Sequence, residues 1–172
     1  MGTSDPAASS TAPAAAGEPA ADADRHAQSQ RFWDAWRELD KLYERYARSQ
    51  GLSYTSLCVL DEIWRAQTSG EALTQKVIGE RTFLPKQTVN SIVGAFLRDG
   101  LVELAELPQD RRAKVVRLTE PGRRFAERVI VPEDEAEDEA FSEFSEAERE
   151  QLLALLVRFV AACRGRLEAR SS

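Results

Sequence analysis

The chain has 172 residues, a formal net charge of −6 and 42% hydrophobic residues. That length gives room for one domain with its own core plus a terminal tail. No stretch reaches the roughly 20 apolar residues that a membrane-spanning helix needs, and no apolar leader follows the start, so we expect a cytoplasmic protein that has no membrane partner.

The first predicted segment, residues 1–29, is rich in Ala, Ser, Pro and Asp and lacks periodic large apolar residues. Such a composition is typical of disorder. A helix is then predicted over residues 31–49, and its apolar stripe is more aromatic than one small core requires. A second helix is predicted from Ser53 to Ala66.

Two short helix signatures come next. Thr74 can cap a helix over residues 73–81, and Pro85 suits the first position of another helix that stops at Gly100. In the second helix, Val89, Ile92 and Val93 recur at helical spacing, with Phe96 continuing the buried stripe. The opposite face presents side chains that can reach base edges and phosphates, namely Lys86, Gln87, Thr88, Asn90 and Ser91.

A β-hairpin with a basic tip is predicted after Gly100. Residues 101–106 and 114–118 alternate apolar and polar side chains, and the turn between them carries Asp110, Arg111 and Arg112. The spacing of Asp110 and Arg112 would let the carboxylate orient a guanidinium toward a minor groove, although an ordinary solvated turn is the alternative.

Two helices followed by such a hairpin predict a winged helix-turn-helix that binds duplex DNA. The candidate DNA-contacting residues are Thr74, Gln75, Lys86, Gln87, Thr88, Asn90, Ser91, Asp110, Arg111, Arg112 and Lys114. The charge is divided accordingly: residues 73–130 carry eleven basic and seven acidic side chains, a balance of +4, whereas residues 131–150 carry a balance of −9. Such asymmetry can steer DNA to one face, and a solvated acidic helix face is the simpler explanation of the second run.

The remaining chain predicts two more helices. Thr119 is placed to cap a connecting helix that is expected to bend or break near Pro132, because proline lacks the N–H of its helical turn. Ser145 and Glu148 form a capping box that opens the last helix. Together with the helix over residues 31–49, this helix predicts a dimer clasp, with an intramolecular pair as the alternative. The candidate interface residues are Phe32, Trp36, Leu152, Leu156, Phe159, Val160 and Cys163.

Catalytic, metal and cofactor sites are not predicted. His26 is the only histidine and lies in the tail, no glycine-rich phosphate loop occurs, and the carboxylates form no matched acid and base. Cys58 and Cys163 fit apolar stripes as small core residues, and thiol-based redox sensing through either one is an alternative.

An apolar cavity between the first two large helices is a further possibility. Its candidate walls are Trp33, Trp36, Tyr43, Tyr54 and Trp64, with the Tyr54 hydroxyl as a polar group, and plain core packing is the alternative.

Four segments resemble the MarR family of bacterial transcription regulators: Thr88–Ser91, Gly100–Val102, Asp110–Arg112 and Leu118–Gly122. The resemblance extends from about Phe32 to Arg170. It implies a mainly α, homodimeric winged helix-turn-helix protein, a repressor or an activator. It also implies an effector pocket between the dimerisation and DNA-binding regions, for which aromatic or phenolic small molecules are candidates.

The expected organisation is therefore a tail (1–29) and one MarR-like domain (30–170). Within that domain, residues 53–118 would bind DNA, and residues 30–50 and 119–170 would form the dimer. The expected function is sequence-specific regulation of transcription at a palindromic site, as a repressor relieved by a small molecule. A winged-helix protein-interaction module without DNA binding is the alternative from another class.

Overall fold

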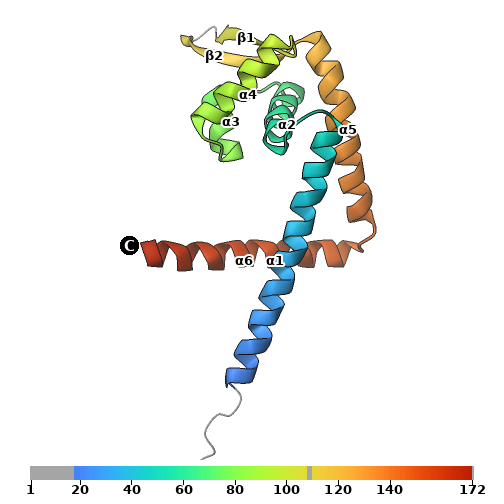
Figure 1. The fold of residues 1–172 in the computed structure, drawn as a ribbon, viewed down its shortest axis with the longest axis vertical. Helices are drawn as coiled ribbons and strands as arrows, with labels where there is room; N and C mark the ends of the chain where they lie inside the picture. The colour runs from blue at the N-terminus through green and yellow to red at the C-terminus, as the bar shows by residue number, and fades with distance from the viewer. Residues whose placement is uncertain (1–17, 108–109, 172) are drawn as a thin grey trace, which may run out of the picture.

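The computed structural model describes residues 18–107 and 110–171, with side chains described at 22–106 and 114–171. Figure 1 shows a compact upper unit carried on long helices. The elements are α1 (Glu18–Ser49), α2 (Tyr54–Ser69), α3 (Gln75–Thr82), α4 (Lys86–Arg98), β1 (Val102–Leu107), β2 (Asp110–Leu118), α5 (Glu120–Ser142) and α6 (Glu146–Ser171). The predicted fold, mainly helical with one small hairpin, is confirmed.

Helices α3 and α4 form the predicted helix-turn-helix. The Thr74 hydroxyl accepts the Val77 N–H at 3.3 Å and so caps α3. Pro85 differs from the prediction, because its extended ψ of 144° makes it the cap of α4 rather than its first helical residue. At the far end Gly100 has a φ of 68°, a backbone conformation that residues with a Cβ rarely adopt, and the chain turns there into β1.

The predicted hairpin is present as an antiparallel pair in which Val102 lies opposite Leu118 and Glu106 opposite Lys114. It is also joined to the start of α3, since the Val116 N–H donates to the Leu73 carbonyl at 2.8 Å and Thr74 pairs with Val115.

One hydrophobic core lies between α2, the helix-turn-helix, the hairpin and the first half of α5. Gly122 sits at its tightest point, because a Cβ built there would lie 1.7 Å from the Leu101 carbonyl oxygen. The Thr119 hydroxyl accepts the Gly122 N–H at 3.1 Å, which confirms the predicted cap of α5. The core residues are Ala47, Leu57, Val59, Leu60, Ile63, Ala66, Leu73, Ile78, Val89, Ile92, Val93, Phe96, Val102, Val116, Leu118, Ala126, Val129 and Ile130.

The long helices differ from the sequence prediction in two places. Helix α1 begins at Glu18 rather than near residue 30, so the expectation of disorder is wrong for residues 18–29, while residues 1–17 lie outside the described part. Alanine-rich sequence favours helix once a downstream helix supplies the nucleus. Helix α5 runs through Pro132 as one continuous helix, so the predicted break is absent, while the alternative of a bend stays a prediction.

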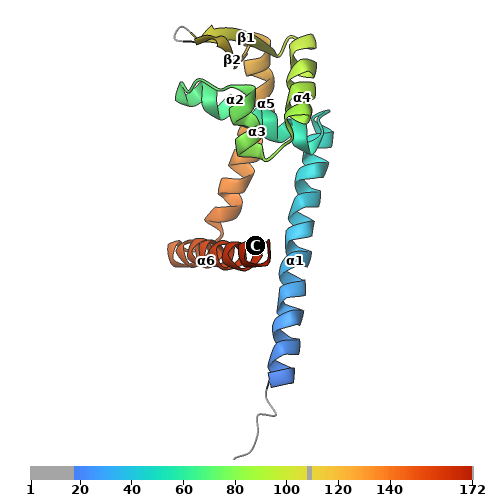
Figure 2. The ribbon, with the colours of Figure 1, turned by 90° about the vertical axis from the view of Figure 1, so that its left-hand side faces the viewer.

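Helix α6 opens with the predicted capping box: the Ser145 N–H donates to the Glu148 carboxylate at 2.8 Å, and the Glu148 N–H donates to the Ser145 hydroxyl at 3.4 Å. It crosses α1 below the upper unit, as Figures 1 and 2 show from two sides. Their contact is aromatic, with the rings of Phe32 and Phe159 centred 5.0 Å apart. Over the described residues, no helix has the length and apolar character that crossing a membrane requires.

Candidate nucleic-acid interface

Helix α4 separates its apolar and polar residues as the sequence predicted. The four stripe residues Val89, Ile92, Val93 and Phe96 are buried. On the outer side, Lys86, Gln87, Asn90 and Ser91 are exposed, whereas Thr88 is half-buried. Four of the five polar candidates on this helix are therefore free to meet a partner.

A hollow of about 410 Å³ lies between α3 and α4 on this outer side. It is lined by Gln75, Lys76, Gly79, Glu80, Leu84, Lys86 and Asn90. Gln75 and Asn90, which were predicted from separate helices, therefore share one surface. The Thr74 hydroxyl caps α3, as predicted, and its contact with DNA stays a prediction.

The hairpin places Lys114 on an exposed site in β2, opposite Glu106. The backbone of Asp110, Arg111 and Arg112 belongs to β2, but their side chains lie outside the described part of the chain. The predicted orientation of Arg112 by Asp110 therefore stays a prediction.

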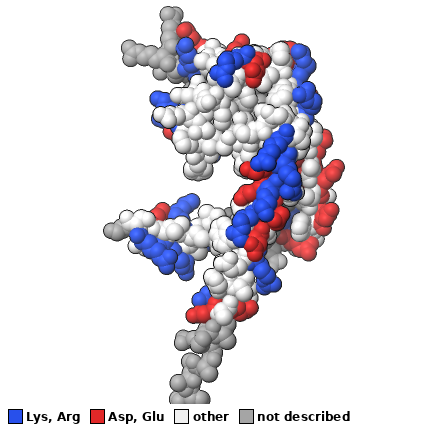
Figure 3. Space-filling model, in the orientation of Figure 1, with Lys and Arg blue, Asp and Glu red and all other residues white. Residues whose placement is uncertain are grey.

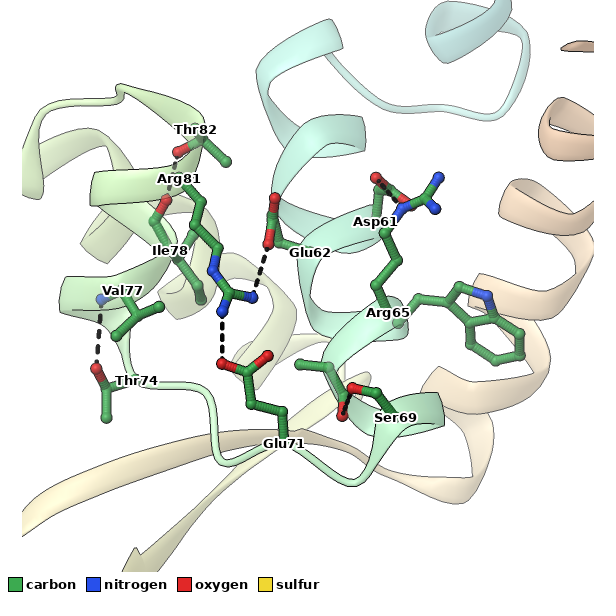
Figure 4. Close-up of polar contacts among 12 residues, drawn as sticks. Asp61, Glu62, Arg65, Ser69, Glu71, Thr74, Val77, Ile78, Arg81 and Thr82 are labelled. Atoms are coloured by element: carbon green, nitrogen blue, oxygen red, sulfur yellow. Dashed lines mark hydrogen bonds and ion pairs between the residues drawn. The ribbon is translucent and has the colours of Figure 1, made fainter.

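Arg81 forms ion pairs within the upper unit and is not a candidate for DNA contact. As Figure 4 shows, its guanidinium points from α3 toward two carboxylates. It lies 2.5 Å from Glu71 and 3.5 Å from Glu62 of α2. Because these partners lie on other elements, sequence spacing gave no sign of this network, which holds α3 against α2.

The predicted dimer residues lie on α1 and α6, and six of the seven are exposed. Phe32, Trp36 and Phe159 keep about 40% of their area exposed even where their rings meet. Leu152, Leu156 and Val160 are exposed too, and Cys163 is half-buried. Helix α6 has no buried residue at all within this chain.

A cavity of about 270 Å³ lies between α1, α2 and α5, and it is lined by Tyr43, Tyr54, Leu57, Cys58, Asp61, Arg65, Glu133, Asp134 and Glu137. Tyr43 and Tyr54 meet there, with ring centres 6.1 Å apart. The other three predicted residues do not line this cavity: Trp33 meets Phe32 edge-to-face on α1, Trp36 lies beside the same ring, and Trp64 packs against the core. Helical spacing did not reveal that α5 supplies one wall.

The cavity is strongly acidic. Arg65 donates to Asp61 at 2.7 Å and to Asp134 at 2.8 Å. Burial, followed by repulsion from Glu137 and the neighbouring aspartates, raises the pKa of Glu133 to about 7. Burial is also the main cause that raises the pKa of Tyr54 to about 12. The Tyr43 hydroxyl donates to Glu137, and burial together with this bond raises the pKa of Tyr43.

The two cysteines are free and half-buried. Burial raises the pKa of the Cys58 thiol, which lowers its thiolate fraction at neutral pH. That environment opposes the redox-sensing alternative for Cys58. The acidic residues of α5 gather on the side opposite the α3–α4 pair, as seen along the right edge of Figure 3.

Comparison with known proteins agrees with this arrangement. A family model described as the MarR family matches residues 50–113, which run from the turn after α1 into β2. The HTH-type transcriptional regulator SarZ of Staphylococcus aureus is 29% identical over 119 residues, covering 69% of this chain and 75% of SarZ.

Two solved structures are similar over most of the chain. NMB1585, a MarR family regulator from Neisseria meningitidis, has a TM-score of 0.67 and 26% identity, covering 83% of this chain and 98% of its own. MepR of S. aureus in its DNA-binding conformation has a TM-score of 0.66 and 24% identity, covering 79% and 98%. The predicted resemblance to the MarR family, found at Thr88–Ser91 and in the hairpin, is thereby confirmed.

Proposed function

We propose that the protein is a homodimeric transcriptional regulator that binds a specific duplex DNA sequence. The observation that carries this proposal is the outer face of α4, where Lys86, Gln87 and Asn90 stand exposed beside the hairpin while the opposite stripe is buried. Amide side chains pair with adenine and a lysine reaches phosphate or guanine, which suits a helix that enters the major groove. Such a protein acts at the chromosome, in the cytoplasm, and not as an enzyme.

The dimer is supported by the surface of α6. Leucine, valine and phenylalanine side chains surround this helix, including Leu153, Leu155 and Val157, which are 48–68% exposed. Residues 152–163 of α6 include only one charged side chain, Arg158, and so large an apolar surface is stable in water only when other helices cover it. A second copy, bringing its own α1 and α6, would cover both exposed surfaces at once.

An effector site is proposed at the cavity between α1, α2 and α5. Helix α2 belongs to the upper unit, whereas α5 continues into α6 and α1 packs against α6. A molecule bound in the cavity would therefore touch both the proposed DNA-binding unit and the helices of the proposed dimer. A volume of about 270 Å³ suits a small single-ring compound. Binding of such a compound should raise the thermal midpoint of the parent protein, and Tyr54→Ala should abolish that rise.

The names of the relatives support the same function. SarZ is a transcriptional regulator, and MepR has been solved as a DNA complex. For this chain the direct test is selection of bound fragments from genomic DNA at two salt concentrations. We expect an imperfect palindrome with half-sites about one helical turn apart, bound more weakly at the higher salt. No binding at either salt would favour the protein-interaction alternative.

A further inference from the structure

Phe83, in the turn between α3 and α4, has an unusual backbone conformation and an unusually exposed side chain. Its φ is 55°, which makes it the one non-glycine residue with a positive φ in the described part of the chain. Its side chain is 92% exposed, whereas the next most exposed large apolar side chain, Val157, reaches 68%. A bulky apolar residue is thus held in a left-handed backbone conformation with its ring in water.

Both properties oppose folding. A Cβ is disfavoured at this φ, and an exposed ring gains nothing from the hydrophobic core. Elsewhere the chain uses glycine for such turns, at Gly51, Gly70 and Gly100. The exception at Phe83 therefore requires a reason outside the stability of this chain, and local strain of this kind concentrates at functional sites.

The position of Phe83 is fixed by its neighbours. Before it, the Thr82 hydroxyl donates to the Ile78 carbonyl at 2.7 Å in the last turn of α3. After it, Leu84 packs on the core and lines the hollow between α3 and α4, and Pro85 caps α4. Only Leu84 and Pro85 lie between Phe83 and Lys86, the first residue of the helix whose outer face carries the polar candidates.

We propose that Phe83 is a DNA-contacting residue whose ring packs on apolar atoms of the duplex beside the groove that α4 enters. Those atoms are thymine C5-methyl groups or deoxyribose carbons. Phenylalanine cannot donate or accept in base pairing, but contact with a thymine methyl is a recognised means of reading sequence. This inference rests on the proposed DNA binding.

A second copy of the chain is a weaker candidate for covering the ring. The uncovered apolar surface that needs a partner lies on α1 and α6, below the upper unit in Figure 1. The turn that carries Phe83 belongs instead to the upper unit, next to the exposed face of α4. Contact with DNA is therefore continuous with the proposed interface, whereas contact with a second copy is not.

The test separates stability from binding by three variants of the full chain. Phe83→Gly and Phe83→Asn accept a positive φ and remove the ring, and Phe83→Tyr keeps the ring. We expect the Gly and Asn variants to keep or raise the thermal midpoint and to bind the selected operator roughly tenfold more weakly. The Tyr variant should bind nearly as the parent protein does.

Equal affinity of the Gly and parent proteins would overturn the inference, as would a lowered thermal midpoint or a changed oligomeric state in the Gly variant. Replacing single thymines of the operator with deoxyuridine identifies the atoms. Loss of parent binding at one position, absent in Phe83→Gly, indicates a methyl contact; no position-specific loss, with the Gly defect retained, indicates the sugars. Failure of the parent protein to bind any fragment would instead refute the proposed function itself.

Discussion

Arg65 on α2 lies 2.8 Å from Asp134 on α5, so an ion pair joins a helix of the upper unit to the helix that leads to α6. Arg65 also pairs with Asp61 in its own helix, and Tyr43 of α1 donates to Glu137 nearby. Three helices therefore meet at one cluster of charged and hydroxyl groups, and the balance of charge in that cluster affects how firmly they pack.

The first prediction concerns pH. The pKa of Glu133 is about 7 in the folded chain, above the ordinary value of 4.5, so the folded state retains a proton that the unfolded state has lost between those values. The free energy of unfolding should therefore fall as pH rises from about 4.5 to about 7. Thermal midpoints of the parent protein and of Glu133→Gln, taken from pH 5 to pH 8, measure this contribution.

At pH 8 the Glu133→Gln protein should be the more stable of the two, and the difference should shrink toward pH 5. Glu135→Gln is the matched control, because Glu135 lies on the same helix but is exposed. If the two Gln variants behave alike across the range, the Glu133 carboxyl does not have the titration described above.

The second prediction tests the reading face. Asn90→Ala and Gln87→Ala should each relax discrimination at one base pair per half-site by about 1–3 kcal/mol, because an adenine contact is lost. Lys86→Ala should weaken binding to all sequences alike. Sequence selection with each variant gives the answer, and unchanged preferences in both amide variants would show that these side chains only keep α4 soluble.

The third prediction concerns the close approach of Gly122 to Leu101. A methyl group at Gly122 would overlap backbone atoms that cannot rotate away, so Gly122→Ala should lower the free energy of unfolding by roughly 3 kcal/mol or more. Gly165→Ala on α6 is the control, since nothing lies within 4 Å of its added Cβ. Chemical denaturation should find the control as stable as the parent or slightly more so.

The fourth prediction concerns α6. Deleting residues 145–172 removes one side of the proposed clasp, so the truncated protein should be monomeric or aggregated and should bind the operator poorly. Sedimentation and DNA titration measure both properties. A monodisperse dimer with full affinity would place the interface elsewhere.

Elements set by local chemistry were predictable from sequence. Three helix ends are marked by single residues: Thr74 and Thr119 through their capping hydrogen bonds, and Gly100 through its backbone freedom. The alternation of apolar and polar residues in the hairpin predicts its buried and exposed faces. These signals were enough to locate α3, α4 and the wing.

Features that depend on contacts between distant segments were not predictable. The cavity needs Glu133 and Glu137 from α5 opposite Tyr43 and Tyr54, and Arg81 finds its carboxylates on other elements. Pro132 likewise lies inside a continuous helix, although its missing N–H favours a helix end. The unusual backbone of Phe83 is invisible to residue preferences, which favour glycine there.

The hydrogen bond from Val116 to Leu73 attaches the hairpin to the segment that leads into α3. The Leu101 N–H also donates to the Phe96 carbonyl of α4 at 2.8 Å, so the hairpin cannot move away from α3 or from the end of α4 without breaking backbone hydrogen bonds. In the proposed dimer, the distance between the two half-sites that can be read at once is set by the tilt of each whole upper unit on α1 and α5. A small rotation at the Arg65–Asp134 contact would move both the hairpin and α4 together and put a pair of half-sites out of reach.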